Sequence, residues 1–115
     1  MRLRSLLQDL KWIGQAKGDK RIYSVVQGTS DYLVVSPNGR TNLNVTIVDK
    51  RAPETLARRF GGREVTTSLL KGKLGRRGLL GEPFAPLNAL YVMVALGRAR
   101  KLKKRAGRAM VFKIR

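Results

Sequence analysis

The fold of this chain is decided by residues 32–48, YLVVSPNGRTNLNVTIV. Residues 37–40, PNGR, are a strong hairpin signal because Asn-Gly accepts positive φ at low cost. After this turn the residues alternate, with Leu43, Val45 and Ile47 on one face and Asn42, Asn44 and Thr46 on the other. With the β-branched segment 21–27 and the turn 28–31 before it, the stretch predicts a three-stranded antiparallel meander with one buried apolar face and one solvent-exposed polar face.

The segment before the meander has helical spacing. Leu3, Leu6, Leu7, Leu10 and Ile13 recur at intervals of three and four, with charged and polar residues between them. This period predicts an amphipathic helix that ends at the glycines 14 and 18 and lies on the sheet. A helix on a membrane surface, with Trp12 at the interface, is the alternative, but the core needs the same apolar stripe.

The second half of the chain predicts three helices and a hairpin. Pro53 and Glu54 suit the first turn of a helix that ends at Gly61-Gly62. Thr66 or Thr67 is expected to cap a second helix that runs to about residue 74. A third, largely apolar helix is expected over residues 86–96, and strands over 98–104 and 108–114.

Residues 54–62, ETLARRFGG, followed by 65–70, VTTSLL, resemble a helix-turn-helix. Ala57 would allow close approach of the helices, and Gly61 four residues later would allow positive φ in the turn. With the helix and basic hairpin that follow, the resemblance extends over residues 52–115 to a winged helix-turn-helix DNA-binding domain. The turn here is longer than the compact form, with a second glycine and two polar residues.

This resemblance completes the expected fold class, which is α+β. An N-terminal helix plus a three-stranded antiparallel meander precedes a helical, helix-turn-helix-like part that is closed by a basic C-terminal β-hairpin. Residues 1–51 are expected to serve packing or dimerisation and residues 52–115 to form the winged-helix-like basic part of one compact unit. Because helix 86–96 offers almost no side chain that could contact a base or phosphate, it is predicted to be a core or dimer helix. The helix near 67–74 is the one expected at a groove.

The charge is concentrated in the second half. The chain has 25 Lys and Arg against 7 Asp and Glu, a formal net charge of +18. Residues 1–60 carry a net +6 and residues 61–115 a net +12, and nine basic residues follow Glu82 with no acidic residue among them. Like charges on one hairpin repel, so the pattern indicates an anionic partner.

The predicted function is nucleic-acid binding, with double-stranded DNA preferred over RNA, in a regulator or chromatin-type protein. An RNA-binding component of a ribonucleoprotein and an adaptor for an acidic protein are the alternatives. A ribonucleoprotein component is commonly basic throughout and carries extended tails, whereas here the charge is local. A homodimer stays open. The predicted contact residues are Ser68, Lys71, Lys73, Arg76, Arg77, Arg98, Arg100, Lys101, Lys103, Lys104, Arg105 and Arg108.

Catalysis is not expected. The chain has no His and no Cys, which excludes Ser-His-Asp chemistry, thiol nucleophiles, disulfides and Cys-ligated metals. Its carboxylates Asp31, Asp49, Glu54 and Glu64 have no spacing typical of a metal site, and segment 72–75 lacks the spacing of a phosphate-binding loop. We therefore predict no enzyme activity, no cofactor and no metal.

A cytoplasmic or nucleoid-associated protein is expected. No stretch reaches the roughly eighteen apolar residues of a membrane span. The N-terminus begins as a signal peptide does, but Gln8, Asp9 and Lys11 interrupt its apolar region. No membrane partner is predicted.

Overall fold

The computed structural model describes residues 10–74 and 86–115, which form an α+β fold with two antiparallel sheets. The first sheet contains β1 (Lys11–Lys17), β2 (Ile22–Gln27), β3 (Asp31–Asn38) and β4 (Asn42–Asp49), in the order β1-β2-β3-β4. The last three are the predicted meander, and Gly39 in the predicted hairpin turn has φ of 79°.

The predicted fold class is wrong at its N-terminal element. Residues 11–13, expected to close a helix, belong to β1, and residues 1–9 of that predicted helix lie outside the described part. The helical spacing ends at Ile13, whereas from Lys11 onward the chain pairs with β2 through a hairpin in which the Gly18 N–H donates to the Arg21 carbonyl at 2.9 Å. The first sheet therefore has four strands.

Gly14 also has a different role from the predicted helix stop. It follows a β-bulge between Trp12 and Gly14, and a Cβ added to Gly14 would lie 3.1 Å from the carbonyl oxygen of Ala95. A residue without a side chain lets this strand approach a helix closely.

The second half contains α2 (Ala52–Phe60), β5 (Glu64–Val65), α3 (Thr67–Leu74), α4 (Pro86–Ala95), β6 (Ala99–Ala106) and β7 (Ala109–Ile114). Pro53 lies in the first turn of α2, and the Thr66 hydroxyl accepts a hydrogen bond from the Leu69 N–H at 3.1 Å, as the capping prediction required. Here too the predicted class needs correction. β5 pairs with β7, so the expected hairpin is part of a three-stranded sheet of order β5-β7-β6, and a strand separates the first two helices.

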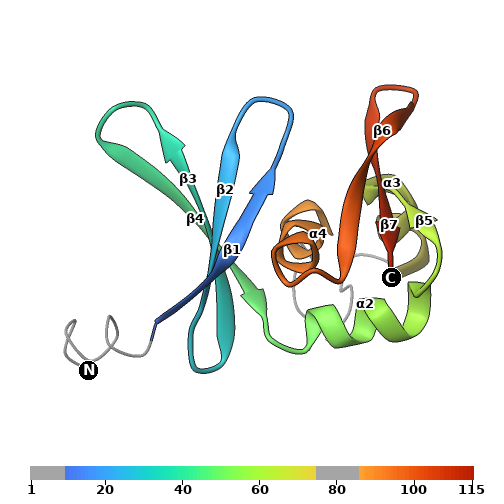
Figure 1. The fold of residues 1–115 in the computed structure, drawn as a ribbon, viewed down its shortest axis with the longest axis horizontal. Coiled ribbons are helices and arrows are strands. Elements are labelled where there is room, and N and C mark those ends of the chain that lie inside the picture. Colours follow the sequence, from blue (N-terminus) through green and yellow to red (C-terminus); the bar gives the residue numbers. More distant parts are fainter. Residues whose placement is uncertain (1–9, 75–85) are drawn as a thin grey trace.

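The core is organised around α4, which lies between the two sheets (Figure 1). It contacts all four strands of the first sheet as well as α2, α3 and β6. Residues 89–93 are at most 2% exposed. The prediction that this helix belongs to the core is confirmed.

The prediction that Leu43, Val45 and Ile47 form the buried face of β4 is wrong. Leu43, Val45 and Ile47 are 65%, 55% and 65% exposed, while Asn44 and Thr46 face α4. The reason lies in β3, where the buried Val34 pairs with Thr46 and thereby fixes which face of β4 turns inward. The sequence of β3 is apolar on both faces, so it does not reveal this choice.

Candidate nucleic-acid interface

The basic hairpin is formed by β6 and β7, with Gly107 at its tip in a positive-φ conformation of 63°. The register shifts between Lys101 and Arg105, so side chains along β6 do not alternate regularly. Arg100, Lys103 and Arg108 are exposed. Arg100 lies directly opposite Lys113 in the ladder, and Glu64 of β5 lies opposite Lys113 on its other side.

Acidic residues from distant parts of the sequence pair with the other hairpin cations. Asp19, in the β1–β2 turn, lies 3.6 Å from the Lys101 ammonium and accepts hydrogen bonds from the Arg105 guanidinium. The hydrogen bond from Arg105 is the main cause that lowers the pKa of Asp19 below its usual 3.8. The turn of the first sheet thus neutralises part of the hairpin.

Two further carboxylates also neutralise cations of the hairpin. Glu54 of α2 lies 3.0 Å from the Arg98 guanidinium, and Glu64 of β5 pairs with Lys104, whose hydrogen bond lowers the pKa of Glu64. The expectation that no acidic residue offsets the hairpin charges is wrong. Carboxylates distant in the sequence form ion pairs with Arg98, Lys101, Lys104 and Arg105. Among the described residues, no carboxylate pairs with Arg100, Lys103 or Arg108.

Helix α3 supplies the other predicted contacts. Ser68, Lys71 and Lys73 are exposed on it, and neither lysine has an acidic partner in the described part of the chain. The predicted contacts Arg76 and Arg77 lie outside the described residues.

The structure adds cations that the sequence prediction missed. The end of α2 and the turn after it are joined to the end of β7, because the Gly62 N–H donates to the Ile114 carbonyl at 2.7 Å. Arg58, Arg59, Arg63 and Arg115 are exposed at this junction. The guanidinium carbons of Arg59 and Arg63 lie 5.9 and 5.5 Å from the centre of the buried Phe60 ring. The sequence signal that could have identified these cations is the pair Arg58-Arg59 and the nearby Arg63, which flank Phe60.

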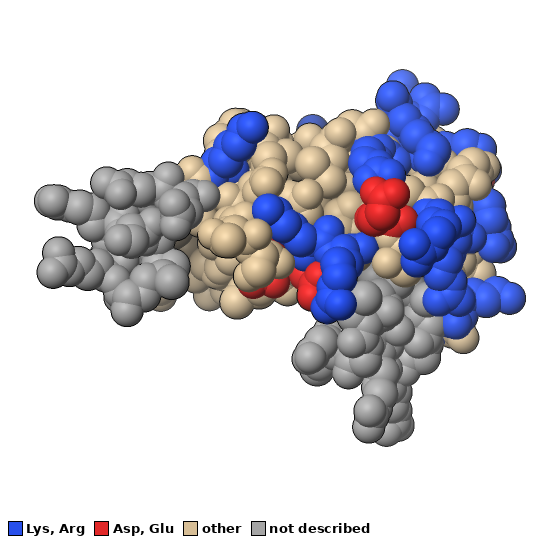
Figure 2. Space-filling model, turned by 90° about the horizontal axis from the view of Figure 1, so that it is seen from below, with Lys and Arg blue, Asp and Glu red and all other residues tan. Residues whose placement is uncertain are grey.

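We define the basic surface as the exposed Lys and Arg of α2, α3, the second sheet and their flanking residues that have no carboxylate partner among the described residues. Its members are Arg58, Arg59, Arg63, Lys71, Lys73, Arg100, Lys103, Arg108 and Arg115. Seen from the side of α2, Lys and Arg gather most densely at the end of the molecule away from the first sheet (Figure 2).

Helix α4 contributes nothing to this surface. Its buried residues pack between the two sheets, and the first sheet covers the side that faces away from β6. A helix in this position cannot enter a DNA groove unless the first sheet moves away.

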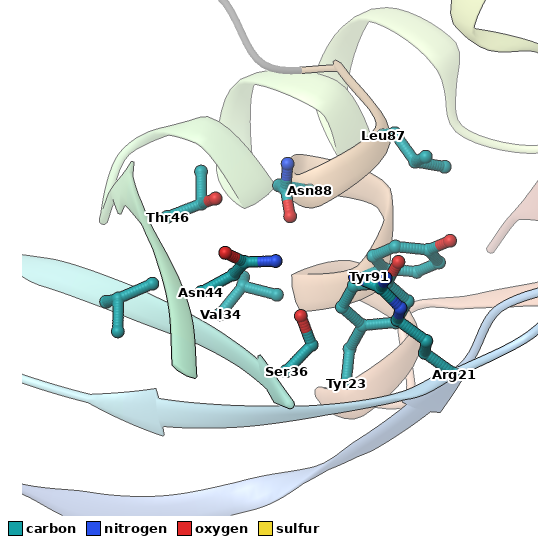
Figure 3. A pocket seen from close by; sticks show the side chains of 10 residues that line it. Arg21, Tyr23, Val34, Ser36, Asn44, Thr46, Leu87, Asn88 and Tyr91 are labelled. Carbon is teal, nitrogen blue, oxygen red and sulfur yellow. The ribbon is translucent and has the colours of Figure 1, made fainter. Parts of the chain in front are cut away.

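A polar recess of about 310 Å³ lies between the first sheet and α4 (Figure 3). Ser36, Asn44 and Thr46 point into it from the strands and Asn88 from α4. Beside them the rings of Tyr23 and Tyr91 stack with centroids 4.2 Å apart. Burial raises the pKa of the Tyr91 hydroxyl above its usual 10.0. The recess can form hydrogen bonds with a small polar molecule.

The predicted absence of a carboxylate metal site is not contradicted by any side chain that the structure describes. Asp31 and Asp49 are cross-strand partners, but Asp49 accepts hydrogen bonds from the backbone and guanidinium of Arg51. Within residues 10–74 and 86–115, no group of three or more potential metal ligands is present, and no helix is long and apolar enough to cross a membrane.

Comparisons with protein-family models, with curated proteins and with solved structures find no match for this chain.

Proposed function

We propose that this protein binds nucleic acid, with double-stranded DNA preferred, through phosphate contacts from the basic surface, and acts as a regulator or chromatin-type protein. The observation that carries the proposal is a set of nine exposed cations without carboxylate partners among the described residues. Within α2, α3, the second sheet and their flanking residues, Arg98, Lys101, Lys104 and Arg105 are already paired with carboxylates, so these nine cations are the exposed ones left there for phosphates.

The order of elements supports a winged-helix-like arrangement. A helix, a short strand, two helices and a hairpin follow one another, and the short strand pairs with the last strand. In the usual arrangement the helix before the hairpin enters the major groove, whereas here that helix is α4 and is buried. The proposed contacts therefore come from α3, the hairpin and the end of α2. Contacts of this kind position a protein on DNA and carry little sequence information.

A duplex is favoured over a single strand because stacking platforms are missing from the basic surface. Single-stranded nucleic acids are bound by exposed aromatic rings on which bases stack. Of the described aromatic residues, only Trp12 is largely exposed, and it lies on the first sheet. Phe60 and Phe112, which are close to the basic surface in sequence, are buried.

The test is a salt titration of binding to a short duplex DNA, with duplex RNA, single-stranded DNA and heparin as competitors. With about six phosphate contacts, affinity should fall around a thousandfold between 50 and 200 mM salt. Duplex DNA should compete better than the other polyanions. A salt-insensitive affinity would exclude phosphate contacts, and equal competition by heparin would reduce the proposal to a generic polyanion binder.

A further inference from the structure

The outer face of the first sheet, which points away from α4, is apolar. The strand registers place Trp12, Val26, Leu33 and Ile47 in one row across it and Val35 and Val45 in the next. Ile22 and Leu43 extend the face toward the turns. Five of these side chains are more than half exposed, namely Trp12, Ile22, Leu43, Val45 and Ile47.

This outer face is large enough to form an interface. The five side chains present on the order of 600 Å² of apolar surface, which is at the upper end of the roughly 300–600 Å² of the largest patch on a typical monomer and approaches the ~800 Å² that each partner buries in a standard complex. Isolated exposed aliphatic residues are common on proteins. A continuous row across four strands is not, and it indicates a surface that is covered in solution.

Among the described residues, charged side chains stand only at the two ends of the outer face. Alternation along the strands puts Lys17 at one end and Asp31 and Asp49 at the other, with Gln15 and Ser24 as the polar residues between them. Two such faces can therefore come together without burying a charge in the centre. A two-fold arrangement that reverses the strand direction brings the unlike ends toward each other.

We propose that the occupant of the outer face is a second copy of this chain, packed sheet against sheet. A face that is self-complementary in this way is what a two-fold interface requires, and aligned sheets pack with interdigitated aliphatic side chains. The net charge of +18 does not prevent this, because the basic surface lies on the other side of α4 (Figure 1). The dimer would display two basic surfaces at its outer ends. This inference does not depend on nucleic-acid binding.

The experiment uses the full chain, freed of nucleic acid by nuclease and studied at high salt so that no polyanion bridges two copies. Sedimentation from roughly 1 to 100 µM, a range suited to an interface of this size, should reveal a dimer of the 12.9 kDa chain. Trp12 is the single tryptophan and lies on the outer face. Its emission should shift to the red and its quenching by acrylamide should increase as the protein is diluted.

Variants locate the interface. Val45→Glu, and independently Ile47→Glu, should raise the dimer dissociation constant at least about tenfold, because a carboxylate would be buried in an apolar contact. Both side chains are exposed in the single chain, so folding should be unaffected, as circular dichroism can verify. Asn42→Glu makes the same charge change on the same strand at an exposed position outside the outer face, and should leave the dimer intact.

Three outcomes would overturn the proposal. The first is a wild-type chain that stays monomeric over the whole concentration range. The second is a dimer that both glutamate variants leave unchanged, since another surface would then hold it. The third is a Trp12 that is protected from acrylamide at every dilution, since the chain's own segments would then cover the face.

Discussion

The strongest test of the basic surface separates cations with and without carboxylate partners on the same hairpin. One variant replaces Arg100, Lys103 and Arg108 by alanine, and its matched control replaces Lys101, Lys104 and Arg105. Both remove three positive charges from one hairpin, but only the second set is paired with Asp19 and Glu64. We expect the first variant to lose much more DNA affinity.

The magnitude follows from counterion release. Each phosphate contact contributes about 0.9 to the slope of log affinity against log salt, so three lost contacts should flatten the slope by about 2.7. At 150 mM salt this corresponds to a loss of affinity of about a hundredfold. The paired cations share their charge with a carboxylate and contact phosphate less well. The control should therefore lose less than about tenfold and change the slope by less than about 1.

Fluorescence anisotropy with a labelled duplex of about 30 base pairs, titrated between 50 and 200 mM salt, measures both quantities. Circular dichroism and thermal unfolding verify that both triple variants fold. If the two triples lost affinity equally, binding would follow net charge and the structural distinction would be refuted. If neither lost affinity, the hairpin would not be a contact surface.

Two further predictions concern stability. Gly18→Ala should destabilise the protein by about 1–3 kcal/mol, because the added Cβ would lie 2.8 Å from atoms of both Tyr23 and Tyr91. Gly72→Ala, in an open position on α3, should instead stabilise it by about 0.5–1 kcal/mol. Thermal unfolding measures both changes, and equal effects of the two substitutions would contradict the close packing at Gly18. Asp19→Asn should destabilise the protein at neutral pH and have no effect in strong acid. The lowered pKa of Asp19 stabilises the folded state above the usual value of 3.8, and this contribution is lost as the pH falls through the lowered pKa. Denaturant unfolding at several pH values measures the effect, and a pH-independent change would show that the ion pairs of Asp19 are unimportant.

Local signals in the sequence were sufficient for much of the fold. Residues 37–40 carry their own turn chemistry, and the meander forms where it was predicted. Pro53 and Thr66 mark helix starts in the same local way. The N-terminal prediction failed because helical spacing in the first residues was extended to Ile13. The strand there is set by hairpin pairing with β2, which the helical period of the preceding residues does not encode.

The candidate site was predictable in location but not in composition. A dense run of cations after Glu82 located the hairpin correctly. Which cations remain available depends on Asp19, 86 residues from Arg105 in sequence, and on Glu54 and Glu64. Charge counting along a chain cannot find such pairs, because they form only when segments distant in the sequence come together in the fold.

The reversed faces of β4 follow from strand pairing and not from a lack of space. Close approach to α4 is confined to β1 and its turn, where a Cβ on Gly14 would lie 3.1 Å from the Ala95 carbonyl and one on Gly18 would lie 2.8 Å from the Tyr91 hydroxyl. At β4 a recess of about 310 Å³ lies beside Asn44 and Thr46, and the pairing of Thr46 with the buried Val34 directs Val45 and Ile47 outward. Burying apolar surface is the main favourable contribution to folding and association. Aliphatic side chains that strand pairing directs away from one interior can contribute to stability only in another, and this is the physical reason to look for a second copy on the outer face.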